Sequence, residues 1–327
     1  MAGVLTGEGQ RVSRAAADVV RAEAAAVPVP PAVRRAPGRR EGLTAFLFLS
    51  PTLLVFVVFV VFPILFSFYL SFQQWNLFAD DHAFVGLANY GAVFSDPEFW
   101  QVFWNTTVYT VATVPLNMVL ALGVAVLLER RVRGKRLLRA AFFTPVVVSS
   151  VAAGVIWRWV FDPNLGLANV ALTAVGLPAV DWTANAAAAM AALIIVGVWK
   201  TFGINMVLFA AGLSAIPSHY YEAAAIDGAR SWSQFRHITL PLLAPTTLFV
   251  LVLSMIGSFQ VFDVVFVLTR GGPLGATKVL VYYLYEHAFK FFDMGYASAV
   301  AYLLFAVLFV LTLVQVRAFR NRGAVAV

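Results

Sequence analysis

The chain has 327 residues, of which 61% are hydrophobic and 12% are charged, with a net charge of +7 and no cysteine. Soluble domains contain roughly 45–50% apolar and about 25% charged residues, so this composition excludes an ordinary soluble protein. It predicts an all-α protein with several membrane-spanning helices. The lack of cysteine excludes disulfides, thiolate chemistry and cysteine-type metal sites.

The first 42 residues are rich in Ala, Pro and Arg and contain no apolar run. A signal peptide needs an apolar core of at least about seven residues, so we expect a disordered cytoplasmic tail instead. A second short cytoplasmic tail is expected at residues 321–327.

Six apolar stretches follow, and each is long enough for about 30 Å of hydrocarbon at roughly 1.5 Å per helical residue. The sequence therefore predicts six transmembrane helices, at residues 45–68, 106–128, 138–161, 187–212, 244–268 and 294–316.

Basic residues are distributed unevenly over the connections between these spans. The two tails and the even-numbered connections hold 18 Lys and Arg, against three in the odd-numbered connections. By the positive-inside rule, both termini and the connection at 213–243 are cytoplasmic. The positive charge thus reflects topology, and a nucleic-acid partner is not expected. The run of six basic residues within 130–139 fits the same explanation, with contact to anionic lipid headgroups or a cytoplasmic partner as alternatives.

The connection at 213–243 holds the longest polar-rich insert of the spanning region. Residues 218–227 predict a short helix that ends at Gly228. Ser231 and Gln234 form a capping-box pattern, which predicts a second helix ending before Pro241. Trp232 and Phe235 share one side of that second helix, so we expect the connection to gain its order by packing on another protein.

Several motifs of this chain resemble one family. The connection contains Glu222-Ala223-Ala224, then Gly228, then Ile238-Thr239-Leu240-Pro241. This pattern resembles the EAA loop of permease subunits of binding-protein-dependent ABC importers. The expected outer segments resemble the sugar-type branch of these permeases, at residues 84–90, 159–169 and 259–273. The resemblance covers residues 45 to 320, and only the tails fall outside it.

The resemblance implies a permease domain at 43–320 in the cytoplasmic (inner) membrane, with a coupling loop at 213–243. It implies two cytoplasmic ATPase subunits, a second homologous permease and an extracytoplasmic solute-binding protein, all within membrane lipid. ATP is bound by the partner subunits, so the chain itself needs no cofactor. The residues expected to couple the chain to the ATPase are Glu222, Ala223, Ala224, Asp227, Gly228, Ile238 and Pro241. The implied solute is a carbohydrate, and a glycerol-phosphate-type solute is the alternative.

Polar residues inside the predicted spans are candidates for the solute pathway, because charge within a bilayer is costly. Lys200 and Asn205 lie near the middle of the fourth span. Lys200 is expected to face either a polar cavity or a neighbouring span. Gln260 and Asp263 share a broad face of the fifth span, while Ser254 and Ser258 fall nearly opposite on a straight helix. We assign Gln260 and Asp263 to the pathway and the two serines to helix packing. Asp263 fits a structural hydrogen bond as well as a solute contact.

Other classes of function lack their motifs. Gly134-Lys135 has no glycine at position 129, so there is no phosphate-binding loop, and the four histidines have no metal-ligand spacing. No catalytic residues are expected, and the chain is not predicted to be an enzyme. An autonomous ion-coupled transporter is the alternative from another class, but it needs intramembrane acids, and Asp263 is essentially the only one here.

Overall fold

The computed structural model describes residues 39–76, 78, 83–129 and 133–321, which divide into two units at Pro63. The first unit holds helix α2 (Arg39–Phe56) and the π-helical turn η1 (Val57–Val61). Because α2 begins at Arg39, the expectation of a disordered tail up to residue 42 is wrong for its last four residues. The rest of that expected tail, and the tail from residue 322 onward, lie outside the described residues.

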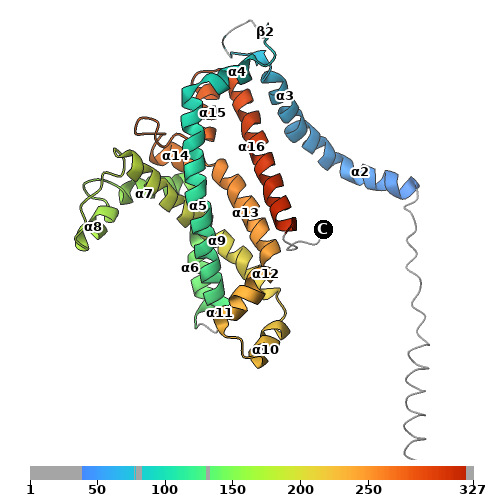
Figure 1. Cartoon of the computed structure of the whole chain (residues 1–327). Coiled ribbons are helices and arrows are strands. Elements are labelled where there is room, and N and C mark those ends of the chain that lie inside the picture. Colours follow the sequence, from blue (N-terminus) through green and yellow to red (C-terminus); the bar gives the residue numbers. More distant parts are fainter. Residues whose placement is uncertain (1–38, 77, 79–82, 130–132, 322–327) are drawn as a thin grey trace, which may run out of the picture. The chain divides into compact units, whose positions relative to one another are not determined.

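The second unit begins within α3 and is almost entirely helical (Figure 1). In chain order its elements are α3 (Phe62–Leu70), β1 (Gln73–Gln74), β2 (Ala83–Phe84), α4 (Ala88–Ser95), α5 (Pro97–Glu129), α6 (Lys135–Val147), α7 (Ser150–Val160), α8 (Leu167–Ala174), α9 (Ala186–Ser214), α10 (His219–Ile226), α11 (Ser231–Gln234), the π-helical turn η2 (Phe235–Thr239), α12 (Leu240–Leu242), α13 (Ala244–Phe259), α14 (Asp263–Leu268), α15 (Leu280–Phe289) and α16 (Met294–Asn321). The two short strands pair antiparallel, with Gln73 opposite Phe84.

Five helical stretches of the described chain are long and apolar enough to cross a membrane. The pair α6 and α7 makes a sixth if it counts as one span, but its two helices meet at 99°. The protein is therefore an all-α polytopic membrane protein. The prediction of one continuous helix at 138–161 is wrong, and the fifth span is also interrupted, between α13 and α14.

The centre of the second unit is the pair α5 and α9, against which α6 and α13 pack. Small residues allow close approach between these helices, as is common where helices meet in membranes. A Cβ on Gly203 of α9 would lie 2.4 Å from the backbone oxygen of Phe142 in α6, so only glycine fits there. Buried side chains form three clusters along the bundle, and the cluster nearest the 213–243 segment contains Leu128, Phe209 and Leu243.

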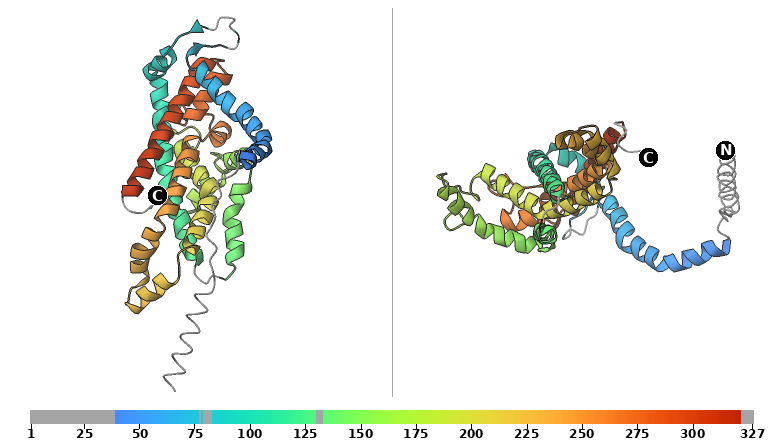
Figure 2. Two further views of the ribbon diagram at one scale, coloured as in Figure 1. Left: turned by 90° about the vertical axis from the view of Figure 1, so that its right-hand side faces the viewer. Right: turned by 90° about the horizontal axis from the view of Figure 1, so that it is seen from below.

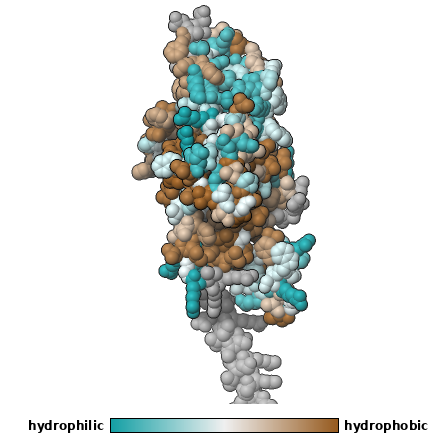
Figure 3. Space-filling model, turned by 90° about the vertical axis from the view of Figure 1, so that its left-hand side faces the viewer, coloured by the Kyte–Doolittle hydropathy of each residue, from teal (hydrophilic) through white to brown (hydrophobic). Residues whose placement is uncertain are grey.

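The second halves of the two interrupted spans, α7 and α14, also pack on each other. Gly154 of α7 faces Val267 of α14 so closely that a Cβ on the glycine would lie 2.8 Å from the valine Cβ. Figure 1 shows α7 and α8 extending to one side of α5, and the view from below in Figure 2 agrees. Hydrophobic residues gather around the middle of the face drawn in Figure 3, and hydrophilic ones toward its upper end. This distribution fits a membrane-embedded middle with wetter ends.

Candidate functional site

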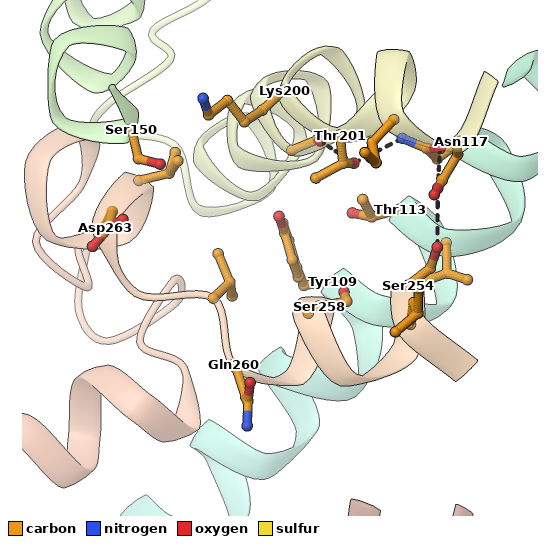
Figure 4. Close-up of a pocket in the computed structure, with 18 of the residues that line it drawn as sticks. Tyr109, Thr113, Asn117, Ser150, Lys200, Thr201, Ser254, Ser258, Gln260 and Asp263 are labelled. Atoms are coloured by element: carbon orange, nitrogen blue, oxygen red, sulfur yellow. Dashed lines mark hydrogen bonds between the residues drawn. The ribbon is translucent and has the colours of Figure 1, made fainter. Parts of the chain in front are cut away.

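A pocket of about 350 Å³ lies within the second unit where the two interrupted spans meet α5 and α9 (Figure 4). Ser150 reaches it from the start of α7, and Gln260 and Asp263 reach it from the break between α13 and α14. Broken helices line solute sites in many transporters, because unwound backbone is tolerated only where it faces protein or a cavity. Two breaks in the spanning helices of the described chain thus meet at this pocket.

A buried hydrogen-bond network forms one wall of this pocket. The Asn205 amide of α9 donates to Asn117 Oδ1 of α5 at 2.7 Å and to Ser254 Oγ of α13 at 2.9 Å. Asn117 in turn donates to Thr201 Oγ1 at 2.8 Å. Asn205 was predicted from the sequence, whereas Asn117 and Thr201 were not. Their signal was the same, a polar side chain within an apolar span.

Lys200 lines the pocket, but its ammonium group is already engaged. It donates to the backbone oxygens of Pro145 at 2.9 Å and Val146 at 3.3 Å, and also to that of Val148. These carbonyls belong to the last turn of α6 and the break beyond it, where no helical N–H can reach them. Of the two surroundings that the sequence left open, the neighbouring span holds the lysine amine.

The expectation that Ser254 and Ser258 face away from Gln260 and Asp263 is wrong. All four residues line the pocket. The helix ends at Phe259, and Phe262 has φ −140° and ψ −60°, so the chain changes direction between the two pairs. A straight helix at 100° per residue, on which that expectation depends, does not continue across this break. Ser258 also packs as expected, since its hydroxyl donates to Thr110 Oγ1 at 3.0 Å.

The 213–243 segment lies at the end of the bundle where α5 ends and α6 begins, and α10 projects farthest there (Figure 1). Its first helix, α10, presents exposed side chains at Glu222, Ala223 and Asp227, while Ala224 is half-buried. Ile226 is 87% exposed. Gly228 has φ +79°, the left-handed conformation that ends a helix, as the sequence predicted. The segment thus offers an exposed short helix followed by a sharp glycine turn.

The start and end of the second helix differ from the prediction. Arg230 occupies the cap position, and the Gln234 amide donates to the Ala229 oxygen at 3.1 Å, so no capping box forms. The helix also continues past Pro241 instead of ending before it. The π-helical turn η2 precedes the proline and widens the helix, which relieves the clash between the proline ring and the preceding turn. Ile238 is half-buried on this turn.

Trp232 and Phe235 stack on each other with ring centroids 5.5 Å apart. Trp232 remains 71% exposed. Both line a groove of about 1000 Å³ whose other wall is the last part of α5, including Leu122 and Val126. Their expected packing on another protein stays a prediction, and the open groove leaves their surface available.

Charged and aromatic residues join α4, α5, α15 and α16 at the opposite end of the bundle. Lys278 forms ion pairs with Glu98 at 2.6 Å and Glu286 at 2.7 Å, and Lys290 pairs with Glu286 at 2.8 Å. Burial works against ionisation of Glu286, but its two lysine partners outweigh burial and lower its pKa. Glu98 lies 180 residues from Lys278 in the sequence, so no spacing rule brings that pair together, whereas Glu286 and Lys290 are one helical turn apart.

Comparison with known proteins places the chain. The family model described as binding-protein-dependent transport system inner membrane component matches residues 117–322. The chain belongs to this family. The matched region of the permease starts at Asn117, and it includes the 213–243 segment and most of the residues that line the pocket.

Curated relatives resemble the permease over most of its length. The trehalose/maltose transport system permease protein MalF of Thermococcus litoralis is 35% identical over 86% of this chain and 96% of the relative. The arabinooligosaccharides transport system permease protein AraP of Bacillus subtilis is 35% identical over 90% of this chain and 97% of the relative. The sulfoquinovosyl glycerol transport system permease protein SmoG of Agrobacterium fabrum is 34% identical over 86% and 92%.

The fold of the permease also matches solved structures. A bacterial ABC transporter that imports the acidic polysaccharide alginate contains a chain with a TM-score of 0.76 at 21% identity, covering 86% of this permease and 96% of that chain. A second structure, of the alginate transporter with a periplasmic protein bound to an alginate pentasaccharide, has a TM-score of 0.77 at 20% identity and covers 88% and 98%. At these identities the likeness establishes the fold.

Within the described residues of the permease, no three His, Asp or Glu side chains gather in a group able to hold a metal ion. The family assignment makes the chain a membrane component of a transport system, distinct from the subunit that hydrolyses ATP.

Proposed function

We propose that this permease forms part of the pathway by which an ABC importer carries a carbohydrate across the cytoplasmic membrane. The observation that carries the proposal is the pocket, whose polar lining consists largely of hydroxyl and amide groups with Tyr109 and Phe262 beside them. Uncharged donors and acceptors together with aromatic faces suit a sugar. Relatives that transport trehalose/maltose and arabinooligosaccharides support the same solute class.

The solute pathway comprises Lys200, Asn205, Gln260 and Asp263, with Ser254 and Asn117 added by the structure. Gln260 and Asp263 are exposed toward the pocket and free to bind hydroxyl groups. A glycerol-phosphate-type solute is the second candidate, because a phosphate needs a cation in the pathway. The carbonyl contacts of the Lys200 amine weigh against it, since they occupy the donors that a phosphate would use.

The energy comes from two ATPase subunits that bind ATP and contact α10 from the cytoplasm. An exposed apolar tip at Ile226, next to the acidic Glu222, suits a groove with a cationic group. Gly228 permits the turn that lets α10 project, and Ile238 and Pro241 join it to α13. We infer that both termini and the 213–243 segment are cytoplasmic, which the distribution of basic residues supports.

Two further partners complete the transporter. A second, homologous permease forms the other half of the pathway, and an extracytoplasmic solute-binding protein delivers the sugar at the end that carries α15. The periplasmic protein in the alginate transporter structure supports such a partner, on a chain of the same fold.

One preparation tests the proposal. The tagged permease is purified from its native membrane together with the subunits that bind it, as wild type and as Glu222→Lys, and uptake is measured in proteoliposomes. We expect the wild type to bring down an ATPase and a second permease, and to accumulate labelled oligosaccharide but not glycerol 3-phosphate. Glu222→Lys should lose the ATPase, because the reversed charge leaves a cation unpaired at the interface.

Arg320→Glu is the matched control, because it reverses an exposed charge on α16, outside the segment. Uptake of glycerol 3-phosphate in place of oligosaccharide would reverse the assignment of the solute. Uptake by the permease alone, driven by a proton gradient, would establish the ion-coupled alternative instead. Full recovery of the ATPase with Glu222→Lys would disprove the role of α10.

A further inference from the structure

A side-chain hydrogen bond connects α10 to the turn that leads into the fifth span. The hydroxyl groups of Tyr221, on α10, and Thr239, the last residue of η2, lie 3.0 Å apart and share a hydrogen bond. Tyr221 is half-buried, and Thr239 is only 6% exposed. A hydrogen bond shielded in this way is held more firmly than one in open water.

Thr239 is in turn anchored to the spanning helices. Its backbone oxygen accepts a hydrogen bond from the Leu243 N–H at 2.9 Å. Leu243 is fully buried, in the same cluster as Phe209 and Leu213 of α9. Any displacement of Thr239 therefore acts on the packed junction of α9 and α13.

The backbone route between α10 and α13 is less direct. It passes through Gly228, whose left-handed conformation lies at a turn with no heavy atom within 4 Å of where a Cβ would be. Across the described residues, no other side-chain hydrogen bond joins α10 to the segment after Gly228. Two backbone hydrogen bonds close this turn onto α10, from the Gly228 N–H to the Ala225 oxygen at 3.1 Å and from the Ala229 N–H to the Ala224 oxygen at 2.9 Å. A movement of α10 can thus be absorbed in the chain after Ala229 unless a second connection carries it.

We propose that Tyr221 is a positioning residue whose hydrogen bond to Thr239 transmits the movement of α10 to α13. This inference rests on the proposed function of α10 as the contact to the ATPase. At the other end of α13, Ser254 and Ser258 line the solute pocket. The Tyr221–Thr239 contact thereby connects the ATPase-facing helix to one wall of the pocket, without itself touching ATPase or solute.

The π-helical turn supports this role. Its last N–H, at Leu240, reaches back to the Phe235 oxygen, so the turn leading into Pro241 is wider than an α-helical one. Such turns often occur at functional positions, because they can rearrange without unwinding the helix. Thr239 is the last residue of this adjustable turn, directly before α12 and four residues before Leu243.

The test compares Tyr221→Phe with Tyr220→Phe in the assembled, reconstituted transporter. Tyr221→Phe removes one hydroxyl and keeps the ring. Tyr220 precedes it on α10, is 46% exposed and makes no described side-chain hydrogen bond, so it is the matched control. Thr239→Val removes the partner hydroxyl at nearly constant volume, and Thr239→Ser retains it.

The readouts are the amount of ATPase that co-purifies and the number of sugars carried per ATP hydrolysed. For Tyr221→Phe and Thr239→Val we expect unchanged co-purification and about fivefold fewer sugars per ATP, the scale of one lost hydrogen bond. The double variant Tyr221→Phe/Thr239→Val should carry no fewer sugars per ATP than either single variant. Thr239→Ser should carry as many sugars per ATP as the wild type. A residue that merely stabilises the fold would change yield and leave sugars per ATP the same.

Wild-type sugars per ATP in Tyr221→Phe would overturn the inference, as would a reduction of the same size in Tyr220→Phe. Loss of the ATPase from Tyr221→Phe would also overturn it and would place Tyr221 in the docking surface. If the wild-type permease itself recovers no ATPase, the proposed function fails first, and this inference fails with it. Amide hydrogen exchange separates the two cases, since Tyr221→Phe should speed exchange at 235–243 in the isolated permease only if the hydrogen bond exists.

Discussion

Lys200 is a charged residue within a span whose observed contacts are structural, since they are hydrogen bonds to backbone oxygens. Its ammonium group supplies donors for three carbonyls at the break between α6 and α7. Without it, these oxygens would face the pocket or lipid unpaired, which costs roughly 1–3 kcal/mol for each buried group. The lysine thus makes the 99° bend possible, while its stem lines the pocket.

Replacing Lys200 by Met tests this structural role. The methionine keeps an apolar side chain of similar length but donates no hydrogen bonds, so we expect a lower melting temperature for the purified permease and poor recovery. Lys200→Arg keeps hydrogen-bond donors, so its melting temperature and recovery should fall less. Thermal unfolding in detergent measures the difference. A stable Lys200→Met protein with only a weaker apparent affinity for sugar would show that the amine serves the solute instead.

Among the elements, α10 and its glycine turn agree with the sequence prediction, because the residue that ends the helix is itself the signal. Gly228 has the left-handed conformation with φ +79°, which glycine adopts freely and which is sterically unfavourable for residues with a Cβ. We therefore expect Gly228→Ala to cost about 1–2 kcal/mol at the turn and to reduce the amount of ATPase recovered. Gly228→Asn should destabilise the turn less than Gly228→Ala, because asparagine adopts the left-handed conformation more readily than alanine.

Gly91, in α4, serves as the control for this glycine series. It lies in ordinary helix, and a Cβ there would meet nothing within 4 Å. Gly91→Ala should therefore leave recovery of the ATPase unchanged and stabilise the helix by roughly 0.5–1 kcal/mol. Equal recovery of the ATPase from Gly228→Ala and Gly91→Ala would show that the turn does not position α10.

The interrupted spans were not predictable from the same signals. Apolar composition identifies a span whether it is straight or bent, so 138–161 and 244–268 each read as one helix. The first break depends on Lys200, which is more than 50 residues away from the carbonyls it satisfies. The second brings Ser258 and Asp263 to one pocket, against their positions on an ideal helix. The polar residues of the proposed pathway could thus be selected from the sequence, but their arrangement around one pocket required tertiary contacts.

At the scale of the whole second unit, the two ends of the bundle are held by different forces. Near the 213–243 segment the core is an apolar cluster that includes Phe209 and Leu243. At the other end, polar contacts add to the apolar packing, since Asp96 accepts hydrogen bonds from Tyr283 at 2.5 Å and Tyr296 at 3.1 Å. Apolar packing is insensitive to pH, whereas the second end contains a half-buried histidine.

This difference predicts a pH dependence located at one end. His287 stacks on Tyr296 with centroids 4.4 Å apart, and burial lowers its pKa below the usual value of about 6.5. The carboxylates of Asp293, Glu98 and Asp96 oppose this shift, while Lys278 reinforces it. As the pH falls below about 6.5, the unfolded chain binds a proton at His287 that the folded chain does not yet bind, so stability is lost.

Comparing wild type with His287→Phe tests this prediction, because phenylalanine retains a ring to stack and cannot be protonated. Wild type should melt at a lower temperature at about pH 5.5 than at about pH 7.5, and His287→Phe should show a smaller difference. Asp96 does not confound this window, since the hydrogen bonds from Tyr283 and the Glu98 N–H outweigh burial and lower its pKa. Hydrogen exchange should locate the added opening at acid pH in α15 and the start of α16. Identical pH profiles for the two proteins, or opening confined to the 213–243 segment, would contradict the assignment to His287.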